Sequence, residues 1–204
     1  MRRLKSILTL IFAKYIFQKN KSWKENPVDF QKKIMQNLVR KAQNTKFGID
    51  HSFNEIKSYS DFKKNIPIRD YEDLSNYIDL IKNGETNVLW PGVPIYFCKT
   101  SGTTSGTKYI PLTKDSLKNQ INTARDAILT YIYETKNASI YNGKMIFIQG
   151  SPDLTFTGAI PTGRLSGIVA HHIPKYLKKN RLPSFESNTI SDWEEKINSI
   201  VEET

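Results

Sequence analysis

The sequence predicts an α/β fold in which an N-terminal helical segment, residues 1–55, packs on a partial α/β domain, residues 56–204. Three observations support this prediction. An apolar run at 95–98 has the length of a buried strand, a loop rich in glycine and hydroxyl side chains follows it, and residues 117–132 repeat apolar side chains at helical spacing. Because few other segments have strand character, we expect the chain to form part of a larger layered domain.

The composition is that of a globular protein. Of the 204 residues, 38% are hydrophobic and 25% are charged, which is enough apolar material for a core and too little polar bias for disorder. The single cysteine, Cys98, excludes an internal disulfide and is typical of a reducing compartment, so we predict a cytoplasmic protein. Cys98 lies in the apolar run, which indicates a buried thiol and not a nucleophile.

The formal net charge of +10 is concentrated near the N-terminus. Residues 1–50 hold 12 basic and 3 acidic side chains, whereas residues 51–204 hold 18 and 17. A basic segment of this kind favours nucleic acid or an anionic membrane, or it is a solvated helix surface. No nucleic-acid-binding motif accompanies it, so we expect no nucleic acid partner.

Residues 1–17 predict an amphipathic helix, with apolar side chains from Leu4 to Ile16 at spacings of three and four. Its basic start resembles a secretory signal, but Lys14 interrupts the apolar stretch and no small-residue cleavage site follows. The run is too short to span a bilayer, so we expect no integral membrane segment. Two interpretations stay open: the helix docks on its own protein, which we favour, or it makes peripheral contact with a membrane.

Three further helices are predicted before the loop. An Asn-Pro pair at 26–27 marks the start of the first. Ser60 and Asp70 are the predicted N-caps of two shorter helices, and the second ends at an Asn-Gly pair at 83–84, which is typical of helix C-termini. His51 lies in a turn, where histidine is more often a surface or capping residue than a ligand.

Residues 100–108 have the composition of an anion-binding loop. Six hydroxyl side chains, two glycines and one lysine occur in these nine residues, between a predicted strand and a predicted helix. Glycine adopts positive φ without strain, so backbone N–H groups can turn toward a ligand, while hydroxyl and lysine side chains donate to phosphate oxygens. The candidate phosphate ligands are Thr100, Ser101, Gly102, Thr103, Thr104, Ser105, Gly106 and Lys108.

The spacing of this loop excludes a Walker A motif. That motif places lysine directly after its second glycine and a Mg²⁺-binding hydroxyl directly after the lysine. Here Thr107 separates Gly106 from Lys108, and Tyr109 follows the lysine. The residues alone leave two interpretations, an anion-binding loop and a solvated turn rich in serine and threonine.

The helix after the loop is predicted to begin at Thr113, as its N-cap. A phosphate close to this N-terminus would interact favourably with unpaired N–H groups and with the helix dipole. Further on, residues 145–148 predict a short buried strand. His171 and His172 are interpreted as structural, because neighbours on a strand point to opposite faces and no cysteine or carboxylate cluster lies at zinc spacing. We therefore predict no metal site on the protein itself.

The last predicted helix begins with a capping box, Ser191 to Glu194. Its expected inner face consists of Trp193, Ile197, Ile200 and Val201. It reaches Thr204 without a glycine or a basic last turn. A helix without a stop signal leads us to expect that the chain is a fragment.

The loop and its flanks resemble a known family. T-S-G-T-T-S-G-T-K at 100–108 is similar to the phosphate-binding signature of the adenylate-forming enzymes, the superfamily of acyl-CoA synthetases and luciferases. Its continuation, K-Y-I-P-L-T, resembles more narrowly the auxin-responsive acyl-acid amido synthetases, bacterial members included. Three flanking segments extend the resemblance over nearly the whole chain: I-P-I-R-D-Y-E-D-L at 66–74, I-K-N-G-E at 81–85 and G-R-L-S-G-I-V-A-H-H-I-P-K-Y-L at 163–177.

The resemblance implies the N-terminal part of the large layered domain of an adenylate-forming enzyme. Such an enzyme activates a carboxylic acid with ATP and Mg²⁺ to an acyl-adenylate and pyrophosphate, and an amino acid amine then attacks and releases AMP. The loop would bind the phosphates and stabilise the departing pyrophosphate. Arg125 is a candidate partner for the substrate carboxylate, since the corresponding helix of the family helps line the acyl pocket; we favour a solvent-exposed arginine. The later nucleotide-binding motifs have no counterpart here, so we expect residues 1–204 to be inactive alone.

Two other classes of function stay open. One is an acyl-CoA or aryl-CoA ligase, which the K-Y-I-P-L-T continuation disfavours because such ligases usually place Pro-Lys-Gly there. The other is a non-catalytic module that binds a membrane or an acidic partner through residues 1–50. On the favoured interpretation the partners are small molecules, a carboxylic acid and an amino acid.

Overall fold

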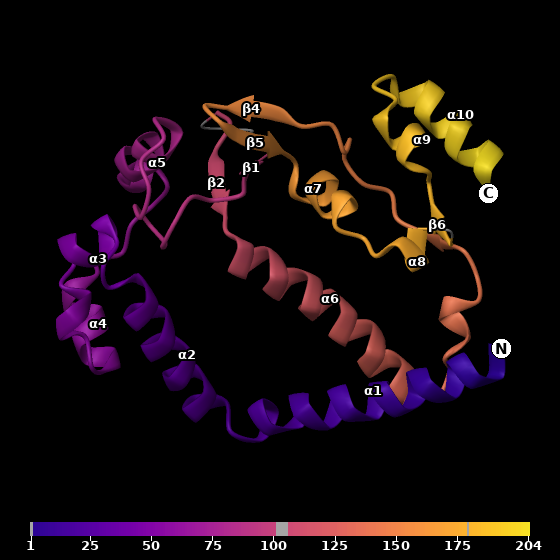
Figure 1. Ribbon diagram of the computed structural model, residues 1–204, viewed down its shortest axis with the longest axis horizontal. Helices are drawn as coiled ribbons and strands as arrows, with labels where there is room; N and C mark the ends of the chain where they lie inside the picture. The colour runs from indigo at the N-terminus through magenta and orange to yellow at the C-terminus, as the bar shows by residue number, and fades with distance from the viewer. Residues whose placement is uncertain (1, 101–105, 179) are drawn as a thin grey trace. The chain divides into compact units, whose positions relative to one another are not determined.

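The computed structural model describes residues 2–100, 106–178 and 180–204 (Figure 1). The chain forms two compact units. The first comprises the residues up to Asn20, Asp115–Thr155 and Thr162–Thr204, and the second comprises Lys21–Lys114 and Phe156–Pro161. Both helices and strands are present, so the predicted α/β class is confirmed. The functional boundary that we placed after residue 55 stays a prediction.

The second unit is built from helices that precede a β-hairpin. Val39 and Ala42 of the first of these helices bury their side chains against Phe53 and Ile56. The helix predicted from the Asn-Pro pair is confirmed, since it begins at Pro27. The helical elements are α2 (Pro27–Ala42), α3 (Lys46–Asp50), η1 (Phe53–Glu55), α4 (Tyr59–Asn65), η2 (Glu72–Leu74) and α5 (Ser75–Lys82).

The caps of the short helices are side chains close to those predicted. The N-cap of α4 is Ser58 and not Ser60, because Ser58 and Asp61 exchange hydrogen bonds in a capping box. Asp70 accepts from the Asp73 N–H at 3.0 Å and donates its own N–H to the Asp73 carboxylate at 3.3 Å. These two bonds stabilise the turn into η2, but the N-cap of η2 is Tyr71 and that of α5 is Leu74, so the prediction of Asp70 as the N-cap was wrong.

A four-stranded sheet has the order β2-β1-β5-β4. β1 (Tyr96–Lys99) and β2 (Tyr109–Leu112) are antiparallel, whereas β4 (Thr155–Thr157) and β5 (Ile160–Gly163) come from much later in the chain. The β4–β5 segment Phe156–Pro161 belongs to the second unit. Ile160 completes a buried cluster with Ile78, Ile81, Val88 and Phe97, so Ile78 and Ile81 mark the buried face of α5.

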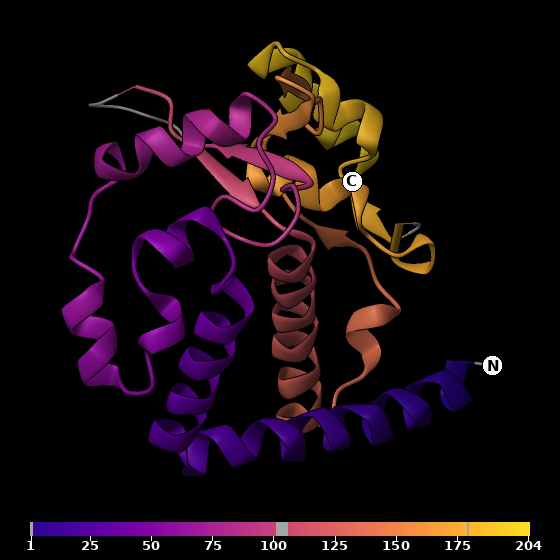
Figure 2. The same ribbon diagram turned by 60° about the vertical axis from the view of Figure 1, so that its left-hand side comes forward.

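The first unit has a core between two long helices. α1 (Arg2–Glu25, up to Asn20 in this unit) packs Ala13 and Ile16 against Leu129 and Ile132 of α6 (Lys114–Thr135), and Figure 2 shows the two helices crossing. The remaining elements are η3 (Ser139–Tyr141), β3 (Met145–Ile146), α7 (Leu165–His171), α8 (Lys175–Lys178), β6 (Arg181–Leu182), α9 (Phe185–Thr189) and α10 (Trp193–Glu203).

The predicted N-terminal helix is confirmed and extends beyond residue 17. It does dock on its own unit, but only Ile16 of the apolar side chains that we assigned to the docking face is buried. The face that docks lies around Ala13, an alanine that the apolar periodicity did not single out. Small residues allow helices to approach closely, which explains why Ala13 is fully buried.

Three predictions for the C-terminal part were wrong in detail. β3 ends at Ile146, and residues 146–148 are exposed, because β3 pairs only with the two-residue strand β6. The two histidines end a helix, α7, and do not lie on a strand. The N-cap of α10 is Asp192, which accepts from the Glu195 N–H at 2.8 Å. Ile200 is buried and Ile197 is half-buried, while Trp193 and Val201 are exposed, since the buried residues of α10 are Lys196 and Ile200.

Candidate phosphate-binding site

The β1–β2 hairpin holds both ends of the candidate loop. In its register Tyr96 pairs with Leu112 and Lys99 with Tyr109. Beyond the last pair, the Thr100 N–H donates to the Lys108 carbonyl oxygen at 3.1 Å, and the Lys108 N–H donates to Thr100 Oγ1 at 3.3 Å. These two bonds close the neck of the loop, so Thr100 and Lys108 are fixed next to each other at its base.

The loop connects two strands and not a strand and a helix, which corrects our expectation. Residues 109–112 form β2, and α6 begins only at Lys114, directly after the predicted N-cap Thr113. Four extended residues separate the loop from that helix by about 13 Å of chain. Since the effect of a helix dipole falls off within the first turn, the loop and Lys108 provide the candidate anion site without it.

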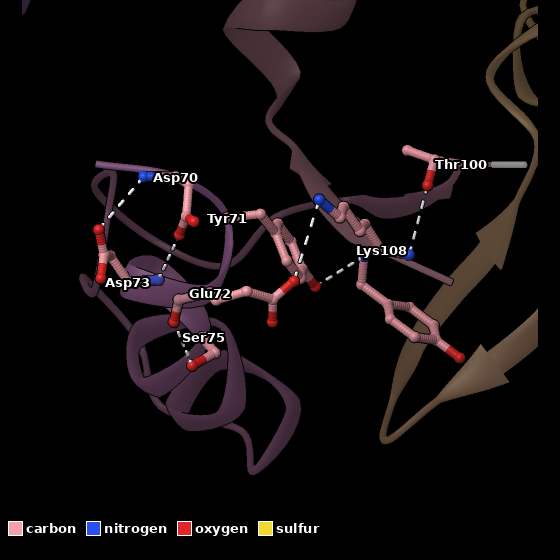
Figure 3. Close-up of polar contacts among 8 residues, drawn as sticks. Asp70, Tyr71, Glu72, Asp73, Ser75, Thr100 and Lys108 are labelled. Atoms are coloured by element: carbon pink, nitrogen blue, oxygen red, sulfur yellow. Dashed lines mark hydrogen bonds and ion pairs between the residues drawn. The ribbon is translucent and has the colours of Figure 1, made fainter. Parts of the chain in front are cut away.

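Lys108 is held by two residues of the segment before α5 (Figure 3). Its ammonium nitrogen lies 5.3 Å from the centroid of the Tyr71 ring and 3.9 Å from Glu72 Oε1. The lysine side chain is 33% exposed and the glutamate 60% exposed. Exposed ion pairs of this length contribute about 0–1 kcal/mol, so Glu72 orients the ammonium group but binds it only weakly.

Tyr71 connects this segment to the hairpin. Its Oη accepts a hydrogen bond from the Tyr109 N–H at 2.8 Å, on the outer side of the edge strand β2 (Figure 3). An edge strand otherwise leaves alternate backbone N–H groups without a partner in the sheet. Tyr71 is itself positioned by the turn into η2, where Asp70 and Asp73 exchange their hydrogen bonds.

The structure thus brings together two segments on which the resemblance depends, 66–74 and 100–113. Tyr71 and Glu72 were quoted within the first segment, but sequence reasoning assigned them no role. The signal was present: an aromatic residue and an acidic residue lie next to each other in a motif that accompanies the loop. Their target, Lys108, lies 36 residues or more away in sequence, and no local pattern identifies it.

Lys82 is a second cation near the hairpin. Its nitrogen lies 4.9 Å from the Tyr109 ring centroid and 2.8 Å from Asp79 Oδ1. The hydrogen bond with Asp79 is the main reason that the pKa of Lys82 is raised. Because Asp79 neutralises Lys82 at hydrogen-bond distance, Lys108 is the better placed of these two lysines to meet an anion.

The predicted loop residues are described only in part. Thr100 and Lys108 lie at the neck, and Gly106 has φ of +80°. This left-handed backbone is the conformation for which a glycine was expected. The other predicted ligands, Ser101, Gly102, Thr103, Thr104 and Ser105, lie outside the described residues.

Arg125 lies on α6 in the first unit. Its guanidinium group donates to Asp126 Oδ1, at 2.9 Å from Nε and 2.7 Å from Nη2, and lies 5.9 Å from the Phe12 ring centroid. The arginine side chain is 42% exposed. A substrate carboxylate would have to compete with Asp126, and the substrate-binding role of Arg125 stays a prediction.

The histidines and the cysteine have structural surroundings. Within residues 2–100, 106–178 and 180–204, no group of three or more histidine, cysteine and acidic side chains is arranged to hold a metal. One ring nitrogen of His171 lies 2.7 Å from the Pro152 carbonyl oxygen, and burial lowers the pKa of His172, with His171 adding to the effect. Burial raises the pKa of the Cys98 thiol, as expected for an unreactive cysteine.

These features define a class of α/β protein in which a glycine-rich loop, the candidate anion-binding loop, is closed between two antiparallel strands. A family model described as the GH3 family N-terminal domain matches residues 17–200. The chain therefore belongs to the GH3 family, which confirms the resemblance to the auxin-responsive acyl-acid amido synthetases.

Curated relatives support this assignment. Indole-3-acetic acid-amido synthetase GH3.15 of Arabidopsis thaliana is 34% identical over 99 residues, which cover 48% of this chain and 16% of the relative. The 4-substituted benzoates-glutamate ligase GH3.12 of the same species is 32% identical over 136 residues, which cover 60% of this chain and 21% of the relative. The chain thus spans about a fifth or less of the length of these relatives.

A solved structure shows the same fold. The AtGH3.15 acyl acid amido synthetase in complex with 2,4-DB superimposes with a TM-score of 0.68 at 22% identity. The match covers 78% of this chain and 28% of that chain. The predicted fold, the N-terminal part of the large layered domain of these enzymes, is confirmed.

Proposed function

We propose that this chain supplies the phosphate-binding part of an ATP-dependent ligase that joins a carboxylic acid to the amine of an amino acid through an acyl-adenylate. Its membership of the GH3 family carries the proposal. The printed names of two relatives describe the joining of an acid to an amine, indole-3-acetic acid in one and 4-substituted benzoates with glutamate in the other. We further propose that the protein is cytoplasmic and that residues 1–55 support the α/β domain.

The loop between β1 and β2 binds the phosphates of ATP in this proposal. Hydroxyl groups and backbone N–H groups at 100–106 donate to phosphate oxygens, and Lys108 places its ammonium group at the neck. As the bond between the α- and β-phosphates breaks, negative charge develops on the departing pyrophosphate. A preorganised cation and donors stabilise this charge more than that of the ground state, which is what accelerates the step.

Lys108 can leave Glu72 and bind a phosphate group in this proposal. Its ion pair with Glu72 is exposed and long at 3.9 Å, whereas hydrogen bonds between an ammonium group and phosphate are charge-assisted and stronger. The Tyr71 ring centroid lies 5.3 Å from the ammonium nitrogen, and we expect this contact to persist when Lys108 binds phosphate. Mg²⁺, when bound with ATP, neutralises phosphate charge, and it keeps mostly phosphate and water ligands, so the single carboxylate Glu72 at the neck fits this donor set.

Arg125 is proposed to bind the carboxylate of the acid. The proposal requires that the guanidinium group leave Asp126, with which it now forms a close ion pair. Its support is the position of Arg125 on the helix that follows the loop and the match of the fold to an acyl acid amido synthetase.

The test is acid-dependent exchange of labelled pyrophosphate into ATP by the native protein that contains this chain, with a panel of indole, benzoate and aliphatic acids. Lys108→Ala is expected to lower kcat/KM by about 10²-fold or more, as does removal of one donor to a developing charge in other enzymes. The matched control is Lys63→Ala, since Lys63 also lies over a tyrosine ring, that of Tyr59, but on α4. It is expected to leave exchange unchanged.

Two outcomes would overturn the proposal. One is no exchange with any acid of the panel, and the other is equal exchange by the native protein and Lys108→Ala. A separate measurement identifies the acceptor: product formation with amino acids supports the amido synthetase, whereas product formation with coenzyme A alone assigns the alternative ligase. Residues 1–204 expressed alone are expected to give no exchange above that of Lys108→Ala.

A further inference from the structure

Helix α1 has a second apolar face that does not dock. The docked face carries Ala13 and Ile16, which are 0% and 2% exposed. The opposite face, called here the outer stripe, has side chains that are between 44% and 62% exposed. The outer stripe consists of Leu4, Ile7, Leu8, Ile11, Phe12 and Tyr15.

The outer stripe is continuous. At 100° per residue its six side chains fall within an arc of about 140°, centred roughly opposite the docked face. Phe12 and Tyr15 stack with ring centroids 6.3 Å apart, and Phe12 also lies 5.9 Å from the Arg125 guanidinium carbon. An apolar surface of this length is much larger than the scattered exposed side chains that are normal on soluble proteins.

Charge borders the outer stripe on both sides. On the same helical wheel Lys5 lies next to Phe12 at one border, and Lys14 lies next to Ile7 at the other. Residues 2–24 contain seven basic side chains and no acidic one. An apolar face between rows of lysine is typical of helices that lie in a membrane interface, where the lysine stems extend beside the apolar face and the ammonium groups reach anionic headgroups.

The outer stripe lies before the residues that the family model matches, which begin at residue 17. None of the described helices is long and apolar enough to cross a bilayer.

We propose that α1 binds the surface of an anionic phospholipid membrane through the outer stripe, with the helix axis in the plane of the interface. The docked face holds the rest of the first unit against the same helix, on the side away from the lipid. The proposal is tested at Ile7 and Ile11, which belong neither to the candidate loop nor to the pair of Phe12 and Arg125.

The test is co-sedimentation of the native protein with vesicles of phosphatidylcholine, with and without phosphatidylglycerol. We expect binding that requires phosphatidylglycerol and weakens with added salt. Ile7→Glu and Ile11→Glu each remove one inserted side chain and are each expected to lower the partition coefficient about tenfold. Ile68→Glu is the matched control, since Ile68 is fully exposed on another segment, and it is expected to bind as the native protein does.

A labelling experiment separates the membrane from a protein cover. Ile11→Cys is expected to react rapidly with a water-soluble maleimide in the absence of vesicles and slowly in the presence of phosphatidylglycerol vesicles. Slow labelling without vesicles would show that another part of the protein covers the stripe, and it would overturn the proposal. Absence of vesicle binding, or equal binding by Ile7→Glu, Ile11→Glu and the native protein, would also overturn it. Pyrophosphate exchange is expected to be unchanged in these variants, so the two proposals fail separately.

Discussion

Tyr71 makes two separable contributions to the neck of the loop, and two substitutions distinguish them. Tyr71→Phe removes only Oη, the acceptor of the Tyr109 N–H at 2.8 Å. Tyr71→Ala also removes the ring, whose centroid lies 5.3 Å from the Lys108 ammonium nitrogen. The first change acts on the edge of the sheet, and the second acts in addition on the cation that we propose to bind phosphate.

The expected magnitudes follow from these contacts. Loss of one backbone hydrogen bond in a half-buried position costs about 1 kcal/mol, which corresponds to a roughly fivefold change in a local opening equilibrium. A partly exposed contact between lysine and an aromatic ring contributes about 0.5–1 kcal/mol, or about two- to fivefold in affinity. Tyr71→Phe is therefore expected to lower the hydrogen-exchange protection of the Tyr109 amide about fivefold while leaving pyrophosphate affinity nearly unchanged. Tyr71→Ala is expected to lower both.

The assays are amide hydrogen exchange at Tyr109 and calorimetric titration with magnesium pyrophosphate. Tyr59→Ala is the matched control, because it removes an exposed ring under a lysine on α4, far along the chain from the loop. If the protection of the Tyr109 amide is unchanged in Tyr71→Phe, the hydrogen bond to Tyr71 Oη does not stabilise the edge strand β2. Equal loss of pyrophosphate affinity in both Tyr71 variants would refute the contribution of the ring.

Three further predictions concern stability and reactivity. Gly158→Ala is expected to destabilise the protein by about 2–4 kcal/mol in urea unfolding. The reason is that φ of Gly158 is +59° and the new Cβ would lie 2.4 Å from the Lys82 carbonyl oxygen. The control Gly143→Ala, which has open space around it, is expected to change the stability little. Hydrogen bonds from the Ser58 hydroxyl and from the Lys57 and Ser58 N–H groups lower the pKa of Asp61 below its usual 3.8. Native Asp61 should therefore make the protein more stable than Asp61→Asn at pH values above 3.8. This difference in stability should disappear as pH falls through the lowered pKa. A stability difference that grows on acidification would contradict this. Cys98 should not react with a thiol reagent at neutral pH until the protein unfolds, and rapid labelling of the native protein would show that it is not buried.

Helix boundaries that depend on a single proline or glycine were predicted from the sequence. The start of α2 at Pro27 follows from the fixed φ of proline. The end of α5 at Lys82 follows from Gly84, two residues later, which is left-handed with φ of +92°. The strand β2 was missed, although the segment was quoted, because Pro111 argues against a strand. The sheet order explains the exception: β2 is an edge strand, and an edge tolerates a residue that has no N–H to donate.

Contacts between distant residues were the ones that could not be predicted. His51 was expected to be a surface or capping residue. It is the C-cap of α3, so the capping role is confirmed. It is nevertheless only 6% exposed, and its ring nitrogens lie 2.8 Å from the Phe47 carbonyl oxygen and 3.1 Å from Arg69 Nη2. Lys196 is likewise buried on the inner face of α10, where its ammonium group donates to the Asn188 carbonyl oxygen at 2.8 Å. Helical periodicity in the sequence predicts that charged side chains face solvent. Lys196 is an exception because α9 lies beside α10 and supplies the carbonyl oxygen that accepts its hydrogen bond.

The candidate site was predictable to the extent that its composition is unusual. Glycine, hydroxyl and lysine residues selected 100–108, and the described neck confirms that Thr100 and Lys108 lie together. The roles of Tyr71 and Glu72 required the fold, because only the pairing of β1 with β2 brings Lys108 back to the segment before α5. The phosphate contacts themselves stay a prediction.

The late arrival of β5 has a consequence for synthesis of the chain. The ribosome completes residues 21–114 before it makes Phe156–Pro161, the segment that supplies Ile160 to the second unit. At about 5–20 residues per second, the 47 residues from 114 to 161 take roughly 2–9 s. During this interval the nascent chain has an unpaired edge at β1 and an incomplete cluster around Phe97. Slow translation or a pause in this stretch would lengthen the exposure of that edge to other nascent chains and to chaperones.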